Sequence, residues 1–396
     1  MNFNDLLLRN APRLGNPSEP FAELLYSQEV RFKNDALKEF WAGMAIGGRL
    51  QPLVEAVMPR GYRTTTKRRS SFNEQRGFAL DFAERPRPGV CTQSILEPDS
   101  HNKIYQQLFD KIDSPAYKPF ARVMNWVVIR GSYTQHCVIF NVTKLDAVIV
   151  RKAKQLAEWL PTLGLGITAA MLYVDPSRSD YYLEAERPDE GLDTKHLFGP
   201  RLLTLAVEDL RLKYPPTVFS QVNESMVPVL VKNAREMLGA TDKDRMLDLY
   251  CGYGLFSFAL GQGCREVLAL EIAGDSIATA QGTAQRLGVQ AKLRFQAVRI
   301  QADSLAARLP MMKPGDSEVI LLDPPRRGAD AGVIALLAAR RPRRVLQICC
   351  GTDEIVPAVN EWKRAGYRVE EARPLDLFPG TANLETLIAL VPDASR

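Results

Sequence analysis

Two glycines follow a carboxylate closely in the segment DLYCGYGLF, which runs from Asp248 to Phe256. The apolar run before it predicts a strand, and Gly252 and Gly254 predict a turn that opens a helix, where backbone can approach a nucleotide-like ligand. Glu271 ends the next predicted strand about twenty residues later, where a carboxylate can accept hydrogen bonds from ribose hydroxyls. Because no third glycine follows Gly254, an NAD site fits this pattern less well.

Two adjacent thiols end a second predicted strand, in the segment RVLQICCG from Arg344 to Gly351. The segment DPPR, residues 323–326, precedes it at the end of a neighbouring strand. Carboxyl ends of parallel strands meet at one edge of a sheet, so a soft nucleophile and a ligand site are predicted to share one crevice. The alternative is that Cys349 and Cys350 are small apolar residues at a buried strand end, which is the commoner fate of cysteine.

Strands and helices alternate regularly from residue 222 to residue 365, as a parallel sheet requires. Predicted strands cover residues 245–250, 266–272, 292–297, 318–323 and 344–349. The last two predicted strands, 367–375 and 385–391, are joined too tightly for a crossover helix and should be antiparallel. The prediction is an α/β fold: a class I methyltransferase doubly wound sheet with a terminal antiparallel hairpin.

The chain before this sheet divides into two parts. A helical N-terminal segment, 1–60, has apolar residues at near-helical spacing from about 34 to 57. A central α+β domain, 61–215, contains short alternating strands and helical stretches near 103–112 and 147–159. The predicted methyltransferase domain is 216–396. The basic run 340–344 lies between a helix and a strand, and we interpret it as a solvated face.

Composition bounds the function without identifying it. The 396 residues are 46% hydrophobic and 24% charged, and the net charge of +5 leans towards an anionic partner. The six cysteines have no zinc-ribbon spacing or disulfide framework, so no metal site is predicted. No signal-peptide core and no apolar run of about 18 residues is present, which indicates a cytoplasmic chain that does not span a membrane. No obligate protein partner is evident.

The motifs together resemble the RNA uracil-5 methyltransferase family. The resemblance covers roughly residues 218–391, in the expected order, and rests on FSQVN (219–223), DLYCGYGLF (248–256), DPPR (323–326) and LFPGTANLE (377–385). It implies methylation of carbon 5 of a uridine in transfer or ribosomal RNA, with S-adenosylmethionine as cofactor. Alignment from Arg344 places Cys350 on the family's nucleophile, and Glu385 corresponds to its general base. The positions that hold the cofactor in the family correspond to Gln221, Tyr250, Gly252, Gly254, Glu271 and Asp323.

The chemistry explains these residue types independently. Carbon 5 of uracil is a weak nucleophile, but addition of a thiolate at carbon 6 makes it enolate-like. After methyl transfer a base must remove the carbon 5 proton before the thiol can leave, and a positioned carboxylate suffices. The target base must also be flipped out of any stack.

Several residues depart from the family pattern. Gly351 and Thr352 replace the Asn-Pro that follows the nucleophile, Leu255 replaces a polar residue, and Asn383 stands where histidine is common. These changes lie on the substrate side. The Cys-x5-Cys-x2-Cys spacing that ligates an iron–sulfur cluster in some members does not occur, so no cluster is expected.

RNA contact is predicted to use the central domain. Three segments offer cations with interleaved aromatic residues: 62–63, 67–69 and 76–78. Such runs are also typical of a solvated face.

Two other functions stay open. An RNA cytosine-5 methyltransferase uses the same thiolate chemistry, but keeps its two cysteines on separate motifs. A catalytically degenerate RNA-binding or assembly protein with a methyltransferase fold would explain Leu255, Gly351 and Thr352.

Overall fold

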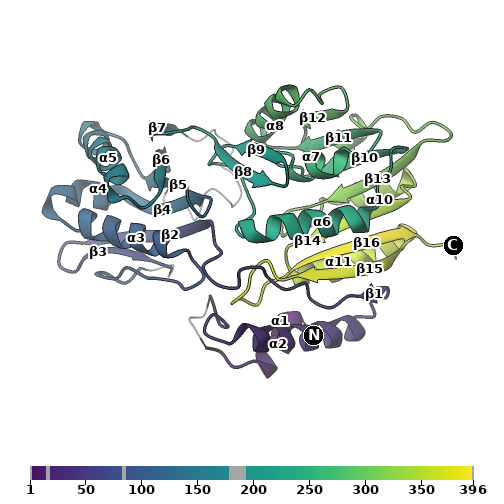
Figure 1. Cartoon of the computed structure of the whole chain (residues 1–396), viewed down its shortest axis with the longest axis horizontal. Coiled ribbons are helices and arrows are strands. Elements are labelled where there is room, and N and C mark those ends of the chain that lie inside the picture. Colours follow the sequence, from purple (N-terminus) through teal and green to yellow (C-terminus); the bar gives the residue numbers. More distant parts are fainter. Residues whose placement is uncertain (1, 15–17, 83–85, 178–192, 395–396) are drawn as a thin grey trace. The chain divides into compact units, whose positions relative to one another are not determined.

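The computed structural model describes residues 2–14, 18–82, 86–177 and 193–394. The chain forms two compact units (Figure 1). Unit 1 comprises Met1–Pro59, Ala206–Lys213 and Ser225–Arg396, and unit 2 comprises Arg60–Leu205 and Tyr214–Glu224. The three-part division at 60 and 215 stays a prediction. Among the residues that the structure describes, no helix combines the length and apolar composition needed to cross a lipid bilayer.

Unit 1 is built on an eight-stranded sheet with the order β1-β15-β16-β14-β13-β10-β11-β12. The strands are β1 (Arg49–Leu50), β10 (Asp244–Leu249), β11 (Glu266–Glu271), β12 (Leu293–Ala297), β13 (Ser317–Leu322), β14 (Arg344–Cys349), β15 (Tyr367–Leu375) and β16 (Glu385–Pro392). β10 to β14 pair in parallel, whereas β16 is antiparallel to both β14 and β15. This order confirms the predicted class I methyltransferase fold with its terminal antiparallel hairpin.

The central strands are mostly apolar because both faces of a doubly wound sheet are covered, with Asp248 as a buried exception in β10. Residues 246–249 and 319–322 are buried without interruption. The helices of unit 1 are α1 (Phe3–Asn10), α2 (Tyr26–Gly43), α6 (Val227–Leu238), α7 (Leu255–Gly261), α8 (Gly274–Arg286), α9 (Ala302–Ala306), α10 (Val333–Ala339) and α11 (Thr352–Arg364). Side chains of α1 and α2 join the same hydrophobic core as the sheet, so the N-terminal segment belongs to this unit.

The predicted helical stretch near 34–57 was too long. Helix α2 ends at Gly43, and the chain then runs along the sheet edge, where β1 pairs with β15 and Val54 bridges Leu375. Gly48 has a φ of +69°, and a Cβ there would lie 2.8 Å from the carbonyl oxygen of Val369. This approach of two backbones favours glycine and excludes a continuing helix.

The basic run 340–344 is not a free solvated face. Arg340 donates to both carboxylate oxygens of Glu318, at 2.7 and 2.6 Å. Arg343 binds Asp244 at 2.8 Å, and its guanidinium holds the pKa of that carboxyl well below its usual range despite burial. These arginines therefore pair with acids at the amino-terminal ends of the strands.

A buried ion network ties α2 to the loop between β15 and β16. Lys33 Nζ donates to Glu29 at 2.7 Å and to Asp376 at 2.8 Å, and all three side chains are at most 1% exposed. Glu29 also accepts the backbone N–H of Gly380 at 2.6 Å, and the Tyr26 hydroxyl donates to Asp376 at 3.2 Å. The loop that leads into Glu385 is thus held at its start and at its middle by one helix.

Unit 2 contains a six-stranded sheet with the order β3-β2-β4-β5-β6-β7. Its strands are β2 (Thr65–Asn73), β3 (Gly77–Asp81), β4 (Met124–Gly131), β5 (His136–Val142), β6 (Ile167–Val174) and β7 (Thr194–Phe198). Helices α3 (Asp99–Ile112), α4 (Lys118–Val123) and α5 (Ala147–Trp159) pack with it in a second core, which matches the predicted α+β character. A separate hairpin, β8 (Leu203–Val207) and β9 (Leu210–Tyr214), follows in the chain.

Two histidines are buried together in unit 2. The Nε2 atom of His101 lies 3.2 Å from Nδ1 of His136, and the other ring nitrogen of His101 lies 2.9 Å from the Thr66 hydroxyl. Burial lowers the pKa of His136 to about 4 and that of His101 well below its usual value. Both rings are therefore neutral in the folded protein.

Removal of the buried ammonium should destabilise unit 1. Lys33→Met leaves Glu29 and Asp376 buried without their cation, so we expect the free energy of unfolding to fall by about 3–5 kcal/mol. Lys38→Met is the matched control, because Lys38 is on the same helix and its pair with Asp35 is exposed. Urea denaturation, monitored by circular dichroism, measures the free energy of unfolding of both variants. Equal losses in the two variants would contradict the structural role of the network.

Unit 2 should lose stability in acid. Since the folded pKa values of both histidines lie below the unfolded value of about 6.5, the unfolded chain takes up protons first as the pH falls below 6.5. His136, whose folded pKa is about 4, should remove about 1.5 kcal/mol between pH 6.5 and 5, and His101 should add to this loss. Hydrogen exchange of the β4 and β5 amides, corrected for intrinsic rates, measures this loss. His136→Asn should reduce it, whereas His196→Gln, outside this buried pair, should not.

Candidate active site

The predicted site residues of unit 1 gather where its strands end. Asp248 lies near the end of β10, Glu271 ends β11, and Asp323 follows β13. Cys350 follows β14, and Glu385 begins the neighbouring strand β16. The antiparallel register pairs Cys349 with Thr386. Cys350, the residue after β14, therefore lies opposite Glu385, the first residue of β16. The thiol and the carboxylate proposed for catalysis therefore share one edge of the sheet.

The glycine turn after β10 is a left-handed stretch of backbone. Tyr250, Gly252 and Gly254 have φ values of +65°, +53° and +90°. A Cβ at Gly254 would lie 2.8 Å from Phe295 and 2.9 Å from Phe258, whereas a Cβ at Gly252 would meet open space. Gly254 is thus required by packing, while Gly252 leaves its backbone accessible to a ligand. The half-buried Tyr250 is the one non-glycine among the three.

Two acids frame this turn. Glu271 accepts the N–H of Gly252 at 3.2 Å and that of Ala273 at 2.9 Å, so its carboxylate is fixed against the turn. Asp248 accepts the Ser257 hydroxyl through one oxygen, and its other oxygen is buried with no hydrogen-bond partner in the described part of the chain. Burial, reinforced by Glu271, raises the pKa of Asp248 to about 7 in spite of the Ser257 hydrogen bond. An unsatisfied buried oxygen beside an open glycine turn suits a ligand that brings its own donors.

The two adjacent thiols differ sharply in environment. Cys349 is the last residue of β14 and is fully buried, whereas Cys350 is partly exposed. The Cys350 thiol donates to Oε1 of Glu354 across 3.2 Å. Burial, with the charges of Glu354 and Glu385, raises the pKa of Cys350 above its ordinary value. In the resting protein Cys350 is therefore a thiol that faces carboxylates, and it is more accessible than Cys349.

Three carboxyl groups surround this thiol. Burial raises the pKa of Asp323 and of Glu354 to about 7, and burial with the charge of Asp323 raises that of Glu385 well above its usual range. Arg326 acts in the opposite direction on Glu354 and Glu385. Acids packed this closely share protons near neutral pH, so one can be a donor while another is an acceptor.

Glu354 was missed by the sequence analysis. It lies in the first turn of α11, four residues after Cys350, and is only 7% exposed. The available signal was an acid at helical spacing from the predicted nucleophile, but an exposed acid in a helix's first turn is common and needs no function.

Gln221 is the one predicted cofactor residue outside unit 1. It belongs to unit 2, where its side chain is 8% exposed, and its part in cofactor binding stays a prediction.

The segments predicted to contact RNA are only partly available. Tyr62 and Phe78 are fully buried, so neither ring can stack on a base. Arg68 is also buried, where it donates to both oxygens of Glu97 at 2.7 Å. Alternation along β2 points Lys67 and Arg69 to the other face, where their cations lie 5.8 and 5.2 Å from the Trp126 ring.

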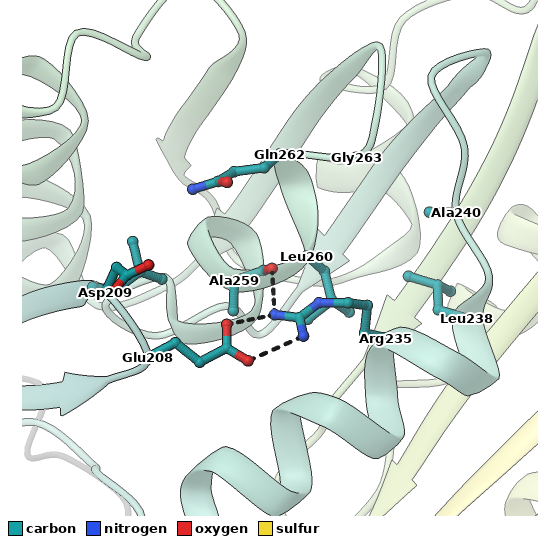
Figure 2. Close-up of a pocket in the computed structure, with 10 residues that line it drawn as sticks. Glu208, Asp209, Arg235, Leu238, Ala240, Ala259, Leu260, Gln262 and Gly263 are labelled. Carbon is teal, nitrogen blue, oxygen red and sulfur yellow. Dashed lines mark hydrogen bonds and ion pairs between the residues drawn. The ribbon is translucent and has the colours of Figure 1, made fainter.

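Unit 1 contains two pockets that bear on the location of the site, among those formed by the described residues. One, of about 150 Å³, is lined by Pro324, Arg326 and Glu354 among others, and so adjoins the carboxyl cluster. The larger, of about 320 Å³, lies at the far end of α7 from the glycine turn (Figure 2). There Arg235 binds Glu208 at 2.8 Å and the Ala259 carbonyl at 3.1 Å, and none of the predicted site residues lines the pocket. We therefore assign the active site to the strand ends and not to the larger pocket.

Known proteins match the chain over these same elements. The model of the family described as tRNA (Uracil-5-)-methyltransferase matches residues 194–392. A 23S rRNA (uracil(1939)-C(5))-methyltransferase RlmD of Alkalilimnicola ehrlichii is 33% identical over 87% of this chain and 73% of its own length. An RNA methyltransferase of Oceanobacillus iheyensis is 27% identical over 72% of this chain, and the match spans 60% of that relative's length.

A solved structure shares the fold. The tRNA (uracil-54, C5)-methyltransferase of Pyrococcus abyssi, in complex with S-adenosyl-L-homocysteine, superposes with a TM-score of 0.69. The alignment covers 96% of this chain and 87% of that one, at 19% sequence identity.

Substitution of Gly254 should disturb the turn. Gly254→Ala places a Cβ against Phe258 and Phe295 at a left-handed φ, so we expect a loss of about 1–3 kcal/mol in the free energy of unfolding. S-adenosylhomocysteine should bind more weakly, as measured by calorimetry. Gly274→Ala is the control, since its Cβ meets nothing within 4 Å and it begins helix α8. Indistinguishable variants would show that the turn tolerates a side chain.

Proposed function

Since this chain belongs to the tRNA (uracil-5-)-methyltransferase family, we propose that it transfers a methyl group from S-adenosylmethionine to carbon 5 of a uridine in transfer or ribosomal RNA. The register of β14 and β16, which brings Cys350 beside Glu385, is the observation that carries this proposal. The chain spans only 60% and 63% of the length of two of the relatives that it matches. Its activity and substrate are therefore proposed from its own residues.

Cys350 makes the reacting carbon nucleophilic. Its Sγ adds to carbon 6 of the uracil, and the electron pair moves to carbon 5, which becomes enolate-like. The partial exposure of Cys350 supports this role, whereas the fully buried Cys349 offers no access to a base.

Glu385 completes the reaction. After methylation, carbon 5 still carries a proton, and its removal allows the bond between Sγ and carbon 6 to break. Glu385 must be ionised at this point, and Arg326 favours that form. The raised pKa of the carboxylate makes it a stronger base than an exposed glutamate.

The residues around the glycine turn fit the cofactor. Tyr250, Gly252 and Glu271 would hold its ribose and amino acid part, and the unpartnered oxygen of Asp248 supports a ligand with donors. Asp323 lies between this turn and the thiol, and Gln221 is the further candidate. When bound, S-adenosylmethionine supplies an electrophilic methyl group; the protein orients the acceptor and excludes water.

The RNA partner is supported by unit 2. Lys67 and Arg69 lie on one face of β2 over the buried ring of Trp126, and these two cations suit contact with the phosphates of RNA. An unstacked base is the form in which carbon 6 can be reached.

Two rival functions fit less well. Cytosine-5 methylation with two thiols needs a second accessible cysteine, and Cys349 is buried in the sheet. A degenerate RNA-binding protein would not need the carboxyl cluster around Cys350, which is costly to bury.

A gene-deletion strain tests the proposal. We expect mass spectrometry of its transfer and ribosomal RNA to show a loss of 5-methyluridine at one site, with 5-methylcytidine unchanged. Cys349→Ala should restore the modification, whereas Cys350→Ala should not. An unchanged nucleoside profile, or rescue by Cys350→Ala, would refute the proposed reaction. Loss of 5-methylcytidine instead would support the cytosine alternative.

A further inference from the structure

Glu354 makes a direct contact with the predicted nucleophile. Its Oε1 accepts the thiol of Cys350 at 3.2 Å, and its Oε2 is buried with no hydrogen-bond partner among the described residues. The first turn of α11 carries it, and the backbone connection from Cys350 through Gly351 is only four residues long. Oε1 is thus in position to receive the thiol proton, and Oε2 makes no hydrogen bond in the described part of the chain that would hold the carboxylate elsewhere.

Cys350 needs a proton acceptor. Neighbouring acids disfavour its thiolate, and the charges that act most strongly on the sulfur are those of Glu354, Glu385 and Asp323. A cysteine activated by a cation would be ionised at rest, but this one is not. Addition to carbon 6 therefore requires the proton to leave as the sulfur attacks.

Gly351 fits this arrangement. A Cβ at residue 351 would lie 2.4 Å from a carboxylate oxygen of Asp353 and 3.2 Å from Oε1 of Glu354. A larger side chain would press on the two carboxylates next to the thiol. The absence of a side chain at 351 leaves room for Glu354 to contact Cys350.

We propose that Glu354 is the general base that accepts the Cys350 proton during addition and returns it during elimination. This inference rests on the proposed function, because it concerns the same nucleophile. It also explains why glycine replaces the asparagine of the Asn-Pro pair at residue 351, because a side chain there would crowd the Glu354 carboxylate.

Protons and electrons balance over the proposed reaction. During addition the S–H bond breaks, its proton moves to Oε1 of Glu354, and its electron pair forms the bond between Sγ and carbon 6. Glu385 later takes the separate proton from carbon 5. As the bond between Sγ and carbon 6 breaks, the pair returns to sulfur and Glu354 gives the proton back. Glu385 releases its proton to solvent, so both groups end as they began.

The pH dependence follows from the groups that face Glu354. These groups are Cys349 at the end of β14, Cys350 directly after it, Asp353 on α11, Asp323 and Arg326 after β13, and Glu385 on β16. Because burial raises the pKa of Glu354 to about 7, the fraction able to accept a proton is about one half at pH 7 and levels off roughly one pH unit higher.

Covalent trapping tests the inference. The probe is total RNA from deletion-strain cells grown with 5-fluorouracil, since fluorine at carbon 5 cannot leave as a proton and the adduct persists. With S-adenosylmethionine present, we expect the unaltered protein to form an adduct whose rate is half-maximal near pH 7 and reaches a plateau at about pH 8. Glu354→Gln should form it at least about 100-fold more slowly at pH 7, with a rate that keeps rising in alkali. The glutamine preserves size, and equal S-adenosylhomocysteine affinity verifies its fold.

Glu361→Gln is the matched control, because it removes a carboxylate of the same type from α11 that is not among the main charges acting on Glu354, and it should keep both the rate and the plateau. If Glu354→Gln traps RNA as fast as the unaltered protein, or keeps the plateau, the assignment of Glu354 is wrong while the proposed function stands. If the unaltered protein forms no adduct, the covalent mechanism fails and this inference with it. A second readout, solvent deuterium exchange at carbon 5 of uridine without cofactor, should show the same defect in Glu354→Gln.

Discussion

The antiparallel return of β16 between β14 and β15 is the constraint on which the site depends. Without it, the carboxyl ends of the parallel strands would still gather a glycine turn and a thiol, but no carboxylate would meet that thiol from the other side. Pairing of Cys349 with Thr386 fixes the relation, and a shift of one residue would turn every side chain of β16 to the opposite face. Register therefore determines chemistry here as well as packing.

The site gathers acids that a stable fold would keep apart. Asp248, Asp323, Glu354 and Glu385 all have raised pKa values, mainly because they are buried. Neighbouring groups partly offset the cost of burying these acids. The Ser257 hydroxyl donates to Asp248, and the charge of Arg326 favours the ionised forms of Glu354 and Glu385. Farther out, Lys33 binds the loop before Glu385 through a buried ion pair. The pattern is one of local electrostatic strain supported by a rigid frame.

The sequence was most informative where one local rule acted alone. Continuous apolar runs with intervening helices predicted the sheet, and the short link between the last two strands predicted their antiparallel pairing. The sequence was least informative where contacts with residues far away in the chain determine the local structure. The end of α2 at Gly43 depends on a sheet edge more than 300 residues away in the chain, and the pairing of Arg340 with Glu318 cannot be read from a basic run. Glu354 and the burial of Tyr62 belong to the same class, since only the folded chain shows what faces them.

Unit 1 is assembled from both ends of the chain, while unit 2 consists of residues that all precede Ser225. During synthesis, β16 leaves the ribosome more than 300 residues after α2, and the pocket for Lys33 does not exist until the loop before β16 has been made. Unit 2 can form its core well before that moment. The N-terminal helices must therefore wait, with apolar faces uncovered, until the strands β10 to β16 have been made.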